Sequence, residues 1–397
     1  MKVSLFLVSI VRLFFFYLSY LWPRDKNIWL FSSFKGNFSD NSKYLYLWLQ
    51  DNEYGIRPIW IAQNEKQCIY LRSKGVEAYA RRSLNGVYFR LKARVYIYTS
   101  YLSDMGYSLS GGACRVNLWH GVGVKKIEFL IENGPLKKIF NQAILNPHRI
   151  LSAHLFFRPN LMLAPSNMMR VHFSKAFRIQ ESAFIDAAYP RIMPAVIESL
   201  RSRALLFGDY EFFFIKKQMY RKILFYLPTW RDAAGSIIDV ALPQKDDLNK
   251  ILIDQNSLLI IKPHPNDQCK KLSNYSNIIE WPLELDFYPV MNEIDVLITD
   301  YSSVLYDFIA VSKEKVWLYI FDYEDYILKS RDLAYPFFEN VDGAILYNFD
   351  ELCGAVEQLD ENLDAIDYTN RKRIIEKFCG SQNGIENIVS RVIEEIR

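Results

Sequence analysis

Short apolar segments alternate with segments of helical character along most of the chain, and this alternation constrains the fold more than any other feature of the sequence. A first series is NIWLFSSF (27–34), RPIWIA (57–62), ARVYIYTS (93–100), VNLWHG (116–121), LMLAPS (161–166) and AFIDAAYPR (183–191), and a second is KILFYLPTW (222–230), SLLIIKPHP (257–265), DVLITDYSS (295–303) and KVWLYI (315–320). Apolar strands separated by helices predict parallel sheets built from βαβ units.

The break between the two series predicts two domains. Residues 192–219 have helical character without strand alternation, and they separate the first series from the second. A chain of 397 residues also exceeds what one hydrophobic core usually supports. We therefore expect an α/β protein with two Rossmann-like domains around a central cleft. The expected division is an apolar helix over 1–24, a first domain over 25–205 and a second domain over 206–397.

The composition excludes several classes of protein. Half of the residues are apolar and 15% are aromatic, which excludes a disordered chain. The net charge of +3 is too weak to indicate nucleic-acid binding, and no nucleic-acid motif is present. The five cysteines are scattered and have no C-x-x-C spacing, so the sequence indicates neither a zinc site nor a disulfide framework. A reducing cytoplasm fits this pattern.

The first residues form an apolar segment of unusual length. VSLFLVSIVRLFFFYLSYLW (3–22) is long enough to span a bilayer, but Arg12 lies near its middle. An arginine there costs about 2.5–3.5 kcal/mol on insertion. No cleavage site follows, which argues against a signal peptide. Three interpretations stay open: an interfacial helix, a spanning helix and a helix packed on the protein. In both membrane cases Lys2, Arg24 and Lys26 would lie at the headgroups.

Polar motifs follow the expected strands. In open parallel sheets, ligands bind in the crevice beyond the carboxyl ends of the strands. The segments WHG, PTWRD, KPHP and TDYSS all occupy this position. The sequence therefore predicts a binding crevice that both series of strands help to build.

The segment WHGVGVKK (119–126) contains the candidate for proton transfer. A neutral histidine at a strand end, opened by two glycines, can take a proton from a hydroxyl nucleophile, which makes His120 a candidate general base. Lys125 and Lys126 would hold an anionic substrate. The alternative is a buried structural histidine followed by solvated lysines.

The segment LITDYSSVLYDF (297–308) predicts an anion site. Asp300 ends the strand, and Ser302 and Ser303 stand at an expected helix N-terminus, where backbone N–H groups attract a phosphate. The alternative is that Ser302 only caps the helix and that Asp307 only stabilises its first turn.

Two further turns carry phosphate-binding candidates. In KPHP (262–265), Lys262 and His264 can donate hydrogen bonds to phosphate oxygens. In YLPTWRD (226–232), Thr229 and Arg231 can do the same. The alternatives are a rigid proline turn in the first case and a strand exit with a solvated arginine in the second.

Two regions of the first domain are candidates for acceptor or membrane contacts. FKGNFSDNSKYL (34–45) places Asp40 and Asn41 after a glycine loop, where they would bind an acceptor or simply cap a helix. Between residues 124 and 150, basic and apolar residues interleave. This pattern is typical of a basic membrane surface, and equally of a half-buried helix.

Taken together, these motifs resemble the CDP-glycerol glycerophosphotransferase family, the teichoic-acid primases and polymerases. The resemblance runs from about residue 25 to about residue 345 and depends on SDNSKYL, NLWHG-x3-KK, AYPR, YLPTWRD, IIKPHP and LITDYSSVLYDF. It implies a glycosyltransferase-B type of fold at the cytoplasmic face of the bacterial membrane. It also implies transfer of a glycerol or ribitol phosphate from a CDP-activated donor to a hydroxyl of a membrane-linked or polymeric glycan, with release of CMP.

The resemblance also implies roles for individual residues. The implied catalytic residues are His120 and His264; the implied donor-binding residues are Thr229, Arg231, Lys262, Asp300, Ser302, Ser303 and Arg331; and the implied acceptor-binding residues are Asp40, Asn41, Lys125 and Lys126. Arg331 is followed by Asp332 where relatives have glycine. We expect no tightly bound cofactor and no metal held by the protein, although Mg²⁺ can accompany the donor.

Two other functions remain compatible with the sequence. The first is a nucleotide-sugar glycosyltransferase of the same fold, and the second is a non-catalytic membrane-bound scaffold of an envelope assembly complex. Within the resembled family, 397 residues is short for a processive polymerase. A single-addition or capsule-type transferase is therefore an equal expectation.

Overall fold

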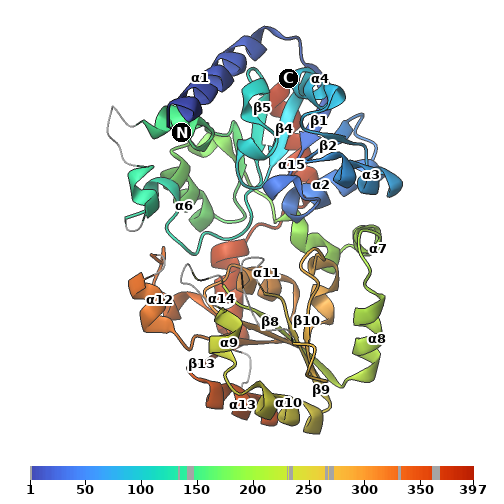
Figure 1. Ribbon diagram of the computed structural model, residues 1–397, viewed down its shortest axis with the longest axis vertical. Helices are drawn as coiled ribbons and strands as arrows, with labels where there is room; N and C mark the ends of the chain where they lie inside the picture. Colours follow the sequence, from blue (N-terminus) through green and yellow to red (C-terminus); the bar gives the residue numbers. More distant parts are fainter. Residues whose placement is uncertain are drawn as a thin grey trace.

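The computed structural model consists of two lobes, each built on a parallel β-sheet (Figure 1). It describes residues 2–132, 135–140, 147–229, 231, 236–263, 267, 272–329, 332–359 and 367–397. The first lobe is the upper part of Figure 1 and contains the first sheet with the helices that cover it. The second lobe is the lower part and contains the second sheet. An α/β fold with two parallel sheets was the prediction from the sequence.

The first sheet has seven strands in the order β3-β2-β1-β4-β5-β6-β7, all parallel. Its strands are β1 (Asp25–Phe31), β2 (Arg57–Ala62), β3 (Ala78–Ala80), β4 (Ala93–Tyr98), β5 (Cys114–Asn117), β6 (Leu161–Leu163) and β7 (Phe184–Ile185). Its helices are α1 (Lys2–Leu18), α2 (Asp40–Asp51), α3 (Glu65–Ser73), α4 (Leu84–Lys92), α5 (His148–Leu151) and α6 (Asn167–Phe177).

The second sheet has six strands in the order β10-β9-β8-β11-β12-β13, again all parallel. Its strands are β8 (Lys222–Leu227), β9 (Ser257–Ile261), β10 (Ile278–Glu280), β11 (Val296–Thr299), β12 (Lys315–Tyr319) and β13 (Ala344–Leu346). The remaining helices are α7 (Glu198–Leu205), α8 (Glu211–Met219), α9 (Ile237–Ala241), α10 (Lys245–Asp254), α11 (Val304–Val311), α12 (Tyr323–Lys329), α13 (Phe349–Glu357), α14 (Tyr368–Cys379) and α15 (Ile385–Ile396).

The central strands are buried on both faces, which explains their continuous apolar sequences. All five residues of β9 and all four of β11 are buried, and Trp29, Trp60 and Trp317 are fully enclosed. Helices on both sides of a parallel sheet require this pattern, because neither face meets water. Burial of these strands is the main source of stability that the sequence encodes.

The last helix of the chain lies against the first lobe. Helix α15 packs on β5 and β7, and its Ile388, Val389 and Val392 are fully buried. The side chain of Asn387 donates to the carbonyl of Asp186, directly after β7. The sequence-based division assigned all of 206–397 to the second domain, whereas this helix contacts the first sheet.

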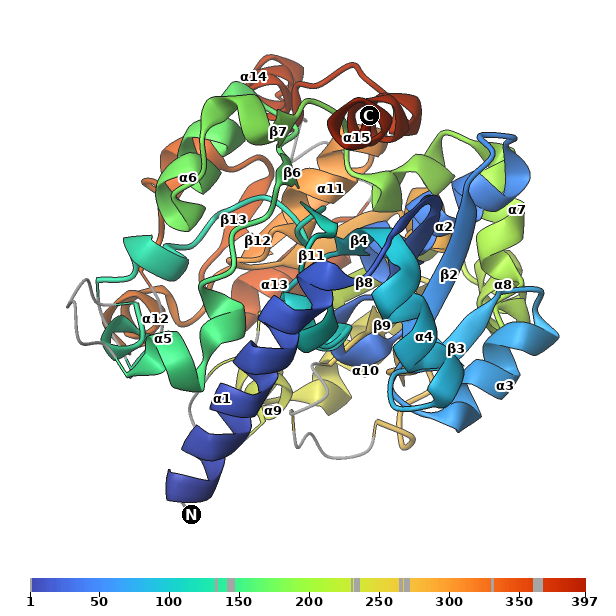
Figure 2. The same cartoon turned by 90° about the horizontal axis from the view of Figure 1, so that it is seen from above.

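Helix α1 lies along the edge of the first lobe, and Figure 2 shows its N-terminal end pointing away from the rest of the molecule. Its protein-facing side carries Ser9, Leu13 and Phe16: the Ser9 hydroxyl donates to the Leu151 carbonyl, and the Phe16 ring contacts Phe157. Arg12 lies at the border of this side and is exposed, and its charge acts on Tyr107 and His154 of the first lobe. Among the described residues, no helix combines the length and the apolar character needed to cross a membrane.

The segment after α1 is tied to the first lobe through Arg24. Its guanidinium donates to the carbonyls of Ala93 and Gly111 at 2.7 and 2.8 Å. Burial lowers the pKa of this group. We had expected Arg24 to lie at lipid headgroups if residues 3–22 met a membrane. In the structure this side chain instead satisfies backbone carbonyls of the first lobe.

Candidate active site

His120 lies in the turn that follows β5, at the seam between the lobes. Its Nδ1 lies 2.9 Å from the carbonyl oxygen of Thr99, which follows the neighbouring strand β4. A carbonyl only accepts hydrogen bonds, so Nδ1 must carry the hydrogen, and Nε2 of a neutral ring then has a lone pair. The indole of Trp119 lies against the ring at 4.2 Å between centroids. The imidazole is therefore oriented with its basic nitrogen available.

The surroundings of His120 keep the ring neutral. His120 is exposed to solvent at the seam, although neighbouring protein groups partly desolvate the ring. This desolvation lowers the pKa of His120, and the Arg191 cation lowers it further, while Asp40 and the Thr99 carbonyl act in the opposite direction. A neutral imidazole at neutral pH is the form that a general base requires.

Asn41 and Arg191 hold the turn that carries His120. The Asn41 amide donates to the carbonyls of Trp119 at 2.7 Å and Leu118 at 3.3 Å, and its oxygen accepts from the Arg191 backbone N–H. Asn41 is fully buried. The contacts of Asn41 support the turn, and its expected role in acceptor binding stays a prediction.

Arg191 joins the two lobes beside His120. Its Nη1 donates to the carbonyl of His120 at 2.8 Å and to Asp40 at 3.1 Å, and its Nη2 donates to Asp307 on α11 of the second lobe. Tyr288 also donates to the same oxygen of Asp307, at 2.8 Å. Burial alone would lower the pKa of Arg191, but the charges of Asp307 and Asp40 outweigh burial and raise it. Asp40 is thus engaged by Arg191, although part of its side chain stays accessible for the acceptor role that we predicted.

The N-terminus of α11 abuts the histidine turn. Gly121 has a φ of +127°, and a Cβ at this position would lie 2.5 Å from Nη2 of Arg191 and 2.8 Å from Oγ of Ser303. Only glycine leaves room for this approach. Ser302 Oγ accepts from the backbone N–H of Val304 at 3.3 Å, so Ser302 acts as a helix cap. Ser303, a predicted donor-site residue, therefore lies beside the histidine turn.

Arg231 and Asp300 form a buried ion pair in the second lobe. Nη2 of Arg231 lies 2.9 Å from Asp300, and its Nε lies 2.7 Å from Asp322. The guanidinium also lies over the rings of Tyr301 and Tyr326, at 5.1 and 4.6 Å from their centroids. Arg231 is only 7% exposed. We expected Arg231 and Asp300 to bind the donor directly. Both are engaged by protein groups whose contacts shape the turn, and their role in donor binding stays a prediction.

Two other predicted donor residues, Thr229 and Lys262, differ in whether their side chains have partners within the protein. The backbone N–H of Thr229 donates to both oxygens of Asp300, at 2.9 and 3.1 Å, while its buried hydroxyl has no hydrogen-bond partner among the described residues. Such an orphaned hydroxyl is suited to a ligand. Lys262 donates to the carbonyls of Leu283 and Leu285, at 3.1 and 3.2 Å, and burial lowers its pKa. Lys262 therefore supports a neighbouring turn.

The two lysines after the histidine turn lie where the lobes meet. The backbone N–H of Lys126 donates to the carbonyl of Asp332, and that of Ala334 donates to the carbonyl of Val124. This antiparallel pairing joins the loop of the first lobe to the second lobe. The ammonium of Lys126 pairs with Glu132 at 2.5 Å, and that of Lys125 lies over the Tyr326 ring.

His264 and Arg331 lie outside the described residues, so their implied roles stay predictions. The described part of the chain contains no group of three His, Cys, Asp or Glu side chains arranged to hold a metal ion. Sequence reasoning gave no role to Arg191, although it lies in the AYPR segment, and it considered Asp307 only as a helix-stabilising acid. The pairing of these two residues across the lobes had no signal in the spacing of the motifs.

The fold defines a two-lobed α/β protein of the Rossmann-like class, and solved structures share it. The wall teichoic acid polymerase TagF matches with a TM-score of 0.73 and 21% identity, over 94% of this chain and 90% of that one. UDP-GlcNAc 2-epimerase from Neisseria meningitidis matches with a TM-score of 0.54 and 12% identity, over 92% of this chain and 99% of that one. These likenesses concern the fold alone.

The family follows from the sequence match. Residues 14–396 match the CDP-Glycerol:Poly(glycerophosphate) glycerophosphotransferase family, and the chain belongs to this family of transferases. The teichoic acid glycerol-phosphate transferase of Staphylococcus aureus is 25% identical over 382 residues, which cover 91% of this chain and 90% of that protein. The teichoic acid poly(glycerol phosphate) polymerase of Bacillus spizizenii is 24% identical, with coverage of 100% and 98%.

Proposed function

We propose that this protein transfers a glycerol or ribitol phosphate from a CDP-activated donor to a hydroxyl of a membrane-linked or polymeric cell-envelope glycan, and releases CMP. The observation that carries the proposal is the histidine turn. His120 has Nδ1 fixed by the Thr99 carbonyl and Nε2 available, at the seam where α11 of the second lobe meets the first lobe. Membership of the glycerophosphotransferase family supports a CDP-alcohol as the donor class.

The proposed step is a displacement at the β-phosphorus of the donor. The acceptor oxygen forms a bond to this phosphorus while His120 Nε2 takes the hydroxyl proton. The bond from the β-phosphorus to the bridging oxygen breaks, and CMP leaves with that oxygen and its electron pair. Negative charge develops on the phosphoryl oxygens, so hydrogen-bond donors must meet it. The Thr229 hydroxyl and the start of α11 at Ser303 are the described groups suited to this task. His264 and Arg331 are predicted to add to them.

The architecture supports a glycosyltransferase-B type assignment with distinct tasks for the lobes. The first lobe supplies His120 and would receive the acceptor, with Asp40, Lys125 and Lys126 near the seam. The second lobe supplies the turns at Thr229 and Ser303 and would bind the donor. The likeness in fold to TagF supports the two-lobed architecture on which this division rests.

Helix α1 is proposed to lie in the interface of the cytoplasmic membrane leaflet. Its outward side exposes a continuous set of apolar side chains, which include Leu7, Val11, Phe14 and Tyr17 at 57, 52, 61 and 66% exposure. Water contact of so many apolar groups on one helix is unfavourable, and burial among lipid chains removes it. Arg12 is exposed at the border of the protein-facing side, where its long side chain can keep the charge at the headgroups during shallow insertion of the outward side.

Nucleotide release tests the proposed reaction. The protein is incubated with CDP-glycerol, CDP-ribitol or UDP-sugars and a crude membrane acceptor, and products are separated by chromatography. We expect CMP from a CDP-alcohol, and we expect His120→Ala to lower turnover by about 10²–10⁴-fold with the fold intact. Lys74→Ala, at an exposed position after α3, is the control and should retain turnover. A nucleoside diphosphate from a UDP-sugar would favour the glycosyltransferase alternative, and no turnover of any donor would favour a scaffold.

A further inference from the structure

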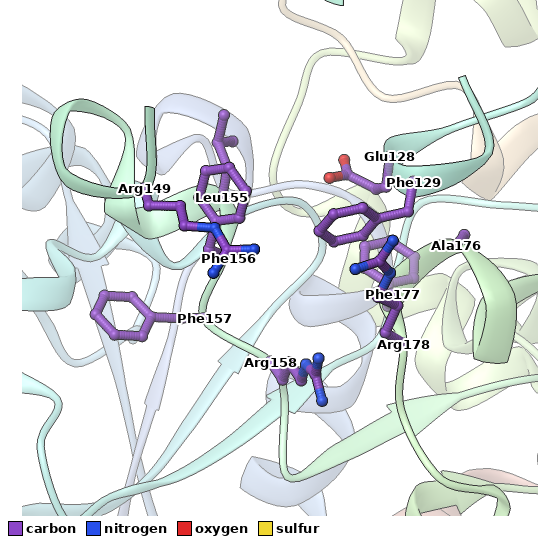
Figure 3. Close-up of a pocket in the computed structure, with 10 residues that line it drawn as sticks. All are labelled: Glu128, Phe129, Arg149, Leu155, Phe156, Phe157, Arg158, Ala176, Phe177 and Arg178. Carbon is purple, nitrogen blue, oxygen red and sulfur yellow. The ribbon is translucent and has the colours of Figure 1, made fainter. Parts of the chain in front are cut away.

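A cavity of about 180 Å³ opens in the first lobe, separate from the histidine turn (Figure 3). Its lining includes Arg149 on α5, Arg158 after η7 (Ala153–Leu155) and Arg178 at the end of α6. Figure 3 shows these side chains arranged around one open space. Within the described residues none of the three has a carboxylate partner. Three unpaired guanidinium groups around a cavity form a strong attraction for an anion.

One carboxyl group, that of Glu128, lies in the same lining. It is 3% exposed and accepts a hydrogen bond from the hydroxyl of Tyr101. Burial raises the pKa of Glu128 to about 7, so near neutral pH this carboxyl is only partly ionised. The cavity therefore keeps a net charge of between about +2 and +3. A ligand with two negative charges matches this charge better than a ligand with one.

The walls between the arginines are apolar. The rings of Phe129, Phe156 and Phe177 line the cavity, and the Arg178 guanidinium lies over the Phe129 ring at 3.8 Å. A site for a small inorganic anion needs no such walls, because its hydrogen-bond donors alone define it. Apolar walls beside cationic groups suit a ligand that joins an anionic end to an apolar body.

The cavity lies between the exposed helix and the catalytic turn. On one side Phe157, which also lines it, contacts Phe16 of α1 at 4.4 Å between ring centroids. On the other side Phe177 contacts Trp119 at 4.9 Å, and Trp119 lies against His120. A ligand in the cavity would thus have the apolar face of α1 on one side and the aromatic support of His120 on the other.

We propose that this cavity binds the phosphate monoester or diphosphate end of an amphiphile whose apolar chain runs toward α1. This inference deepens the proposed function and rests on it for the membrane position of α1, because it gives the membrane-linked acceptor a site in the first lobe. A bulk phospholipid with a phosphodiester carries one negative charge at its phosphate and satisfies the three arginines less well. A phosphate monoester carries about two at neutral pH.

The test compares two double variants with matched loss of charge. Arg158→Gln with Arg178→Gln removes two charges from the cavity, and Lys74→Gln with Arg82→Gln removes two exposed charges elsewhere on the first lobe. Binding of dodecyl phosphate below its micelle concentration is measured by calorimetry. We expect the cavity variant to bind at least about 10-fold more weakly than the wild type, and the control variant to stay within about 2-fold.

Further probes identify the ligand class. Inorganic phosphate and dodecyl maltoside should bind more weakly than dodecyl phosphate, since each lacks one half of the proposed ligand. Phosphatidylcholine vesicles doped with a long-chain isoprenyl diphosphate should retain more protein than phosphatidylglycerol vesicles. Equal retention would overturn the assignment to a monoester or diphosphate, and undiminished binding by the cavity variant would overturn the site.

Release of CMP from CDP-glycerol, measured on the same samples, separates this inference from the proposed function. Dodecyl phosphate binding that depends on Arg158 and Arg178, without any CMP release, would leave the site in place and contradict the transferase reaction. CMP release by a protein that does not bind dodecyl phosphate would support the reaction and overturn the site.

Discussion

Arg191 and Arg231 occupy closely similar environments, and the difference between them separates two tasks. Each guanidinium is buried and paired with two aspartates, and each lies near two tyrosine rings. The partners of Arg231 all belong to the second lobe. Arg191 instead pairs with Asp40 of the first lobe and Asp307 of the second, and it also donates to the carbonyl of His120. The contacts of Arg231 shape one loop of the second lobe. The contacts of Arg191 connect the two lobes to the turn that carries His120.

The largest expected effect is on the stability of the second lobe. Replacement of Arg231 by Leu leaves the buried Asp300 and the partly buried Asp322 near each other without a cation. We expect the free energy of unfolding to fall by about 3–5 kcal/mol, measured by urea denaturation. Arg231→Lys keeps the charge and should cost less. Equal costs for the two variants would mean that the charge at Arg231 is not what holds the loop.

The next effect concerns activity and tests the bridging role of Arg191. Lysine retains the charge but cannot contact His120, Asp40 and Asp307 together. We expect Arg191→Lys to lower kcat by about 10–100-fold, the equivalent of one or two lost charge-assisted hydrogen bonds, with little change in donor KM.

Arg201 provides the matched control for this variant. It also contacts the second lobe, through Glu293 and the carbonyl of Pro289, but it does not touch the histidine turn. Arg201→Lys should therefore retain kcat. A similar loss of kcat in both variants would reduce Arg191 to a general contact between the lobes.

Glu128 extends the comparison of the two arginines to a buried carboxyl group without a cation. It accepts a hydrogen bond from a tyrosine hydroxyl and has no arginine partner among the described residues. Its folded-state pKa, at about 7, is raised above its ordinary value of 4.5. The native state therefore binds more protons than the unfolded state between these values, and stability falls as the pH rises through this window. Glu128→Gln removes this dependence. We expect the variant to be more stable than the wild type by about 1–3 kcal/mol at pH 8 and nearly equal to it at pH 4, by thermal or urea unfolding.

The smallest expected effect is on the pH profile of turnover. The pKa of His120 is lowered by desolvation and by the nearby Arg191 cation. In the pH profile of kcat/KM, the apparent pKa of the acid limb should therefore lie below the ordinary histidine pKa of about 6.5. Arg191→Met should shift this limb to higher pH, while Arg231→Lys should leave it in place. A shift in both variants would indicate that the limb reports on stability and not on His120.

The central part of the fold was predictable, and of the four sheet edges only β7 was among the expected strands. The interior strands such as β9 and β11 have continuous apolar sequences that a parallel sheet requires. The expected series did not include β3, β10 and β13, which have three residues each and lie at sheet edges. A segment of three residues is too short to show a period. The equally short β6 and β7 were expected because they lie within longer apolar segments, 161–166 and 183–191.

The candidate site was predictable in its position and only partly in its contacts. The strand ends identify the edges of the two sheets where His120, Thr229 and Ser303 lie. The structure brings Gly121 of the histidine turn next to Ser303. The sequence cannot indicate whether a strand-exit arginine points to a ligand or to a carboxylate. Arg231 pairs with Asp322, which is 91 residues away, and Arg191 pairs with Asp307 at a separation of 116. Only the fold brings these partners together.

The return of α15 to the first lobe sets an order for folding during synthesis. All the strands of the second sheet come from the continuous stretch between residues 222 and 346, so they are complete well before the ribosome reaches α15. The first sheet begins earlier but stays uncovered beside β5 and β7 until residues 385–396 emerge. The lobe whose strands are synthesised first is thus the one that finishes folding last. Premature termination before residue 385 would expose apolar surface on the lobe that carries His120.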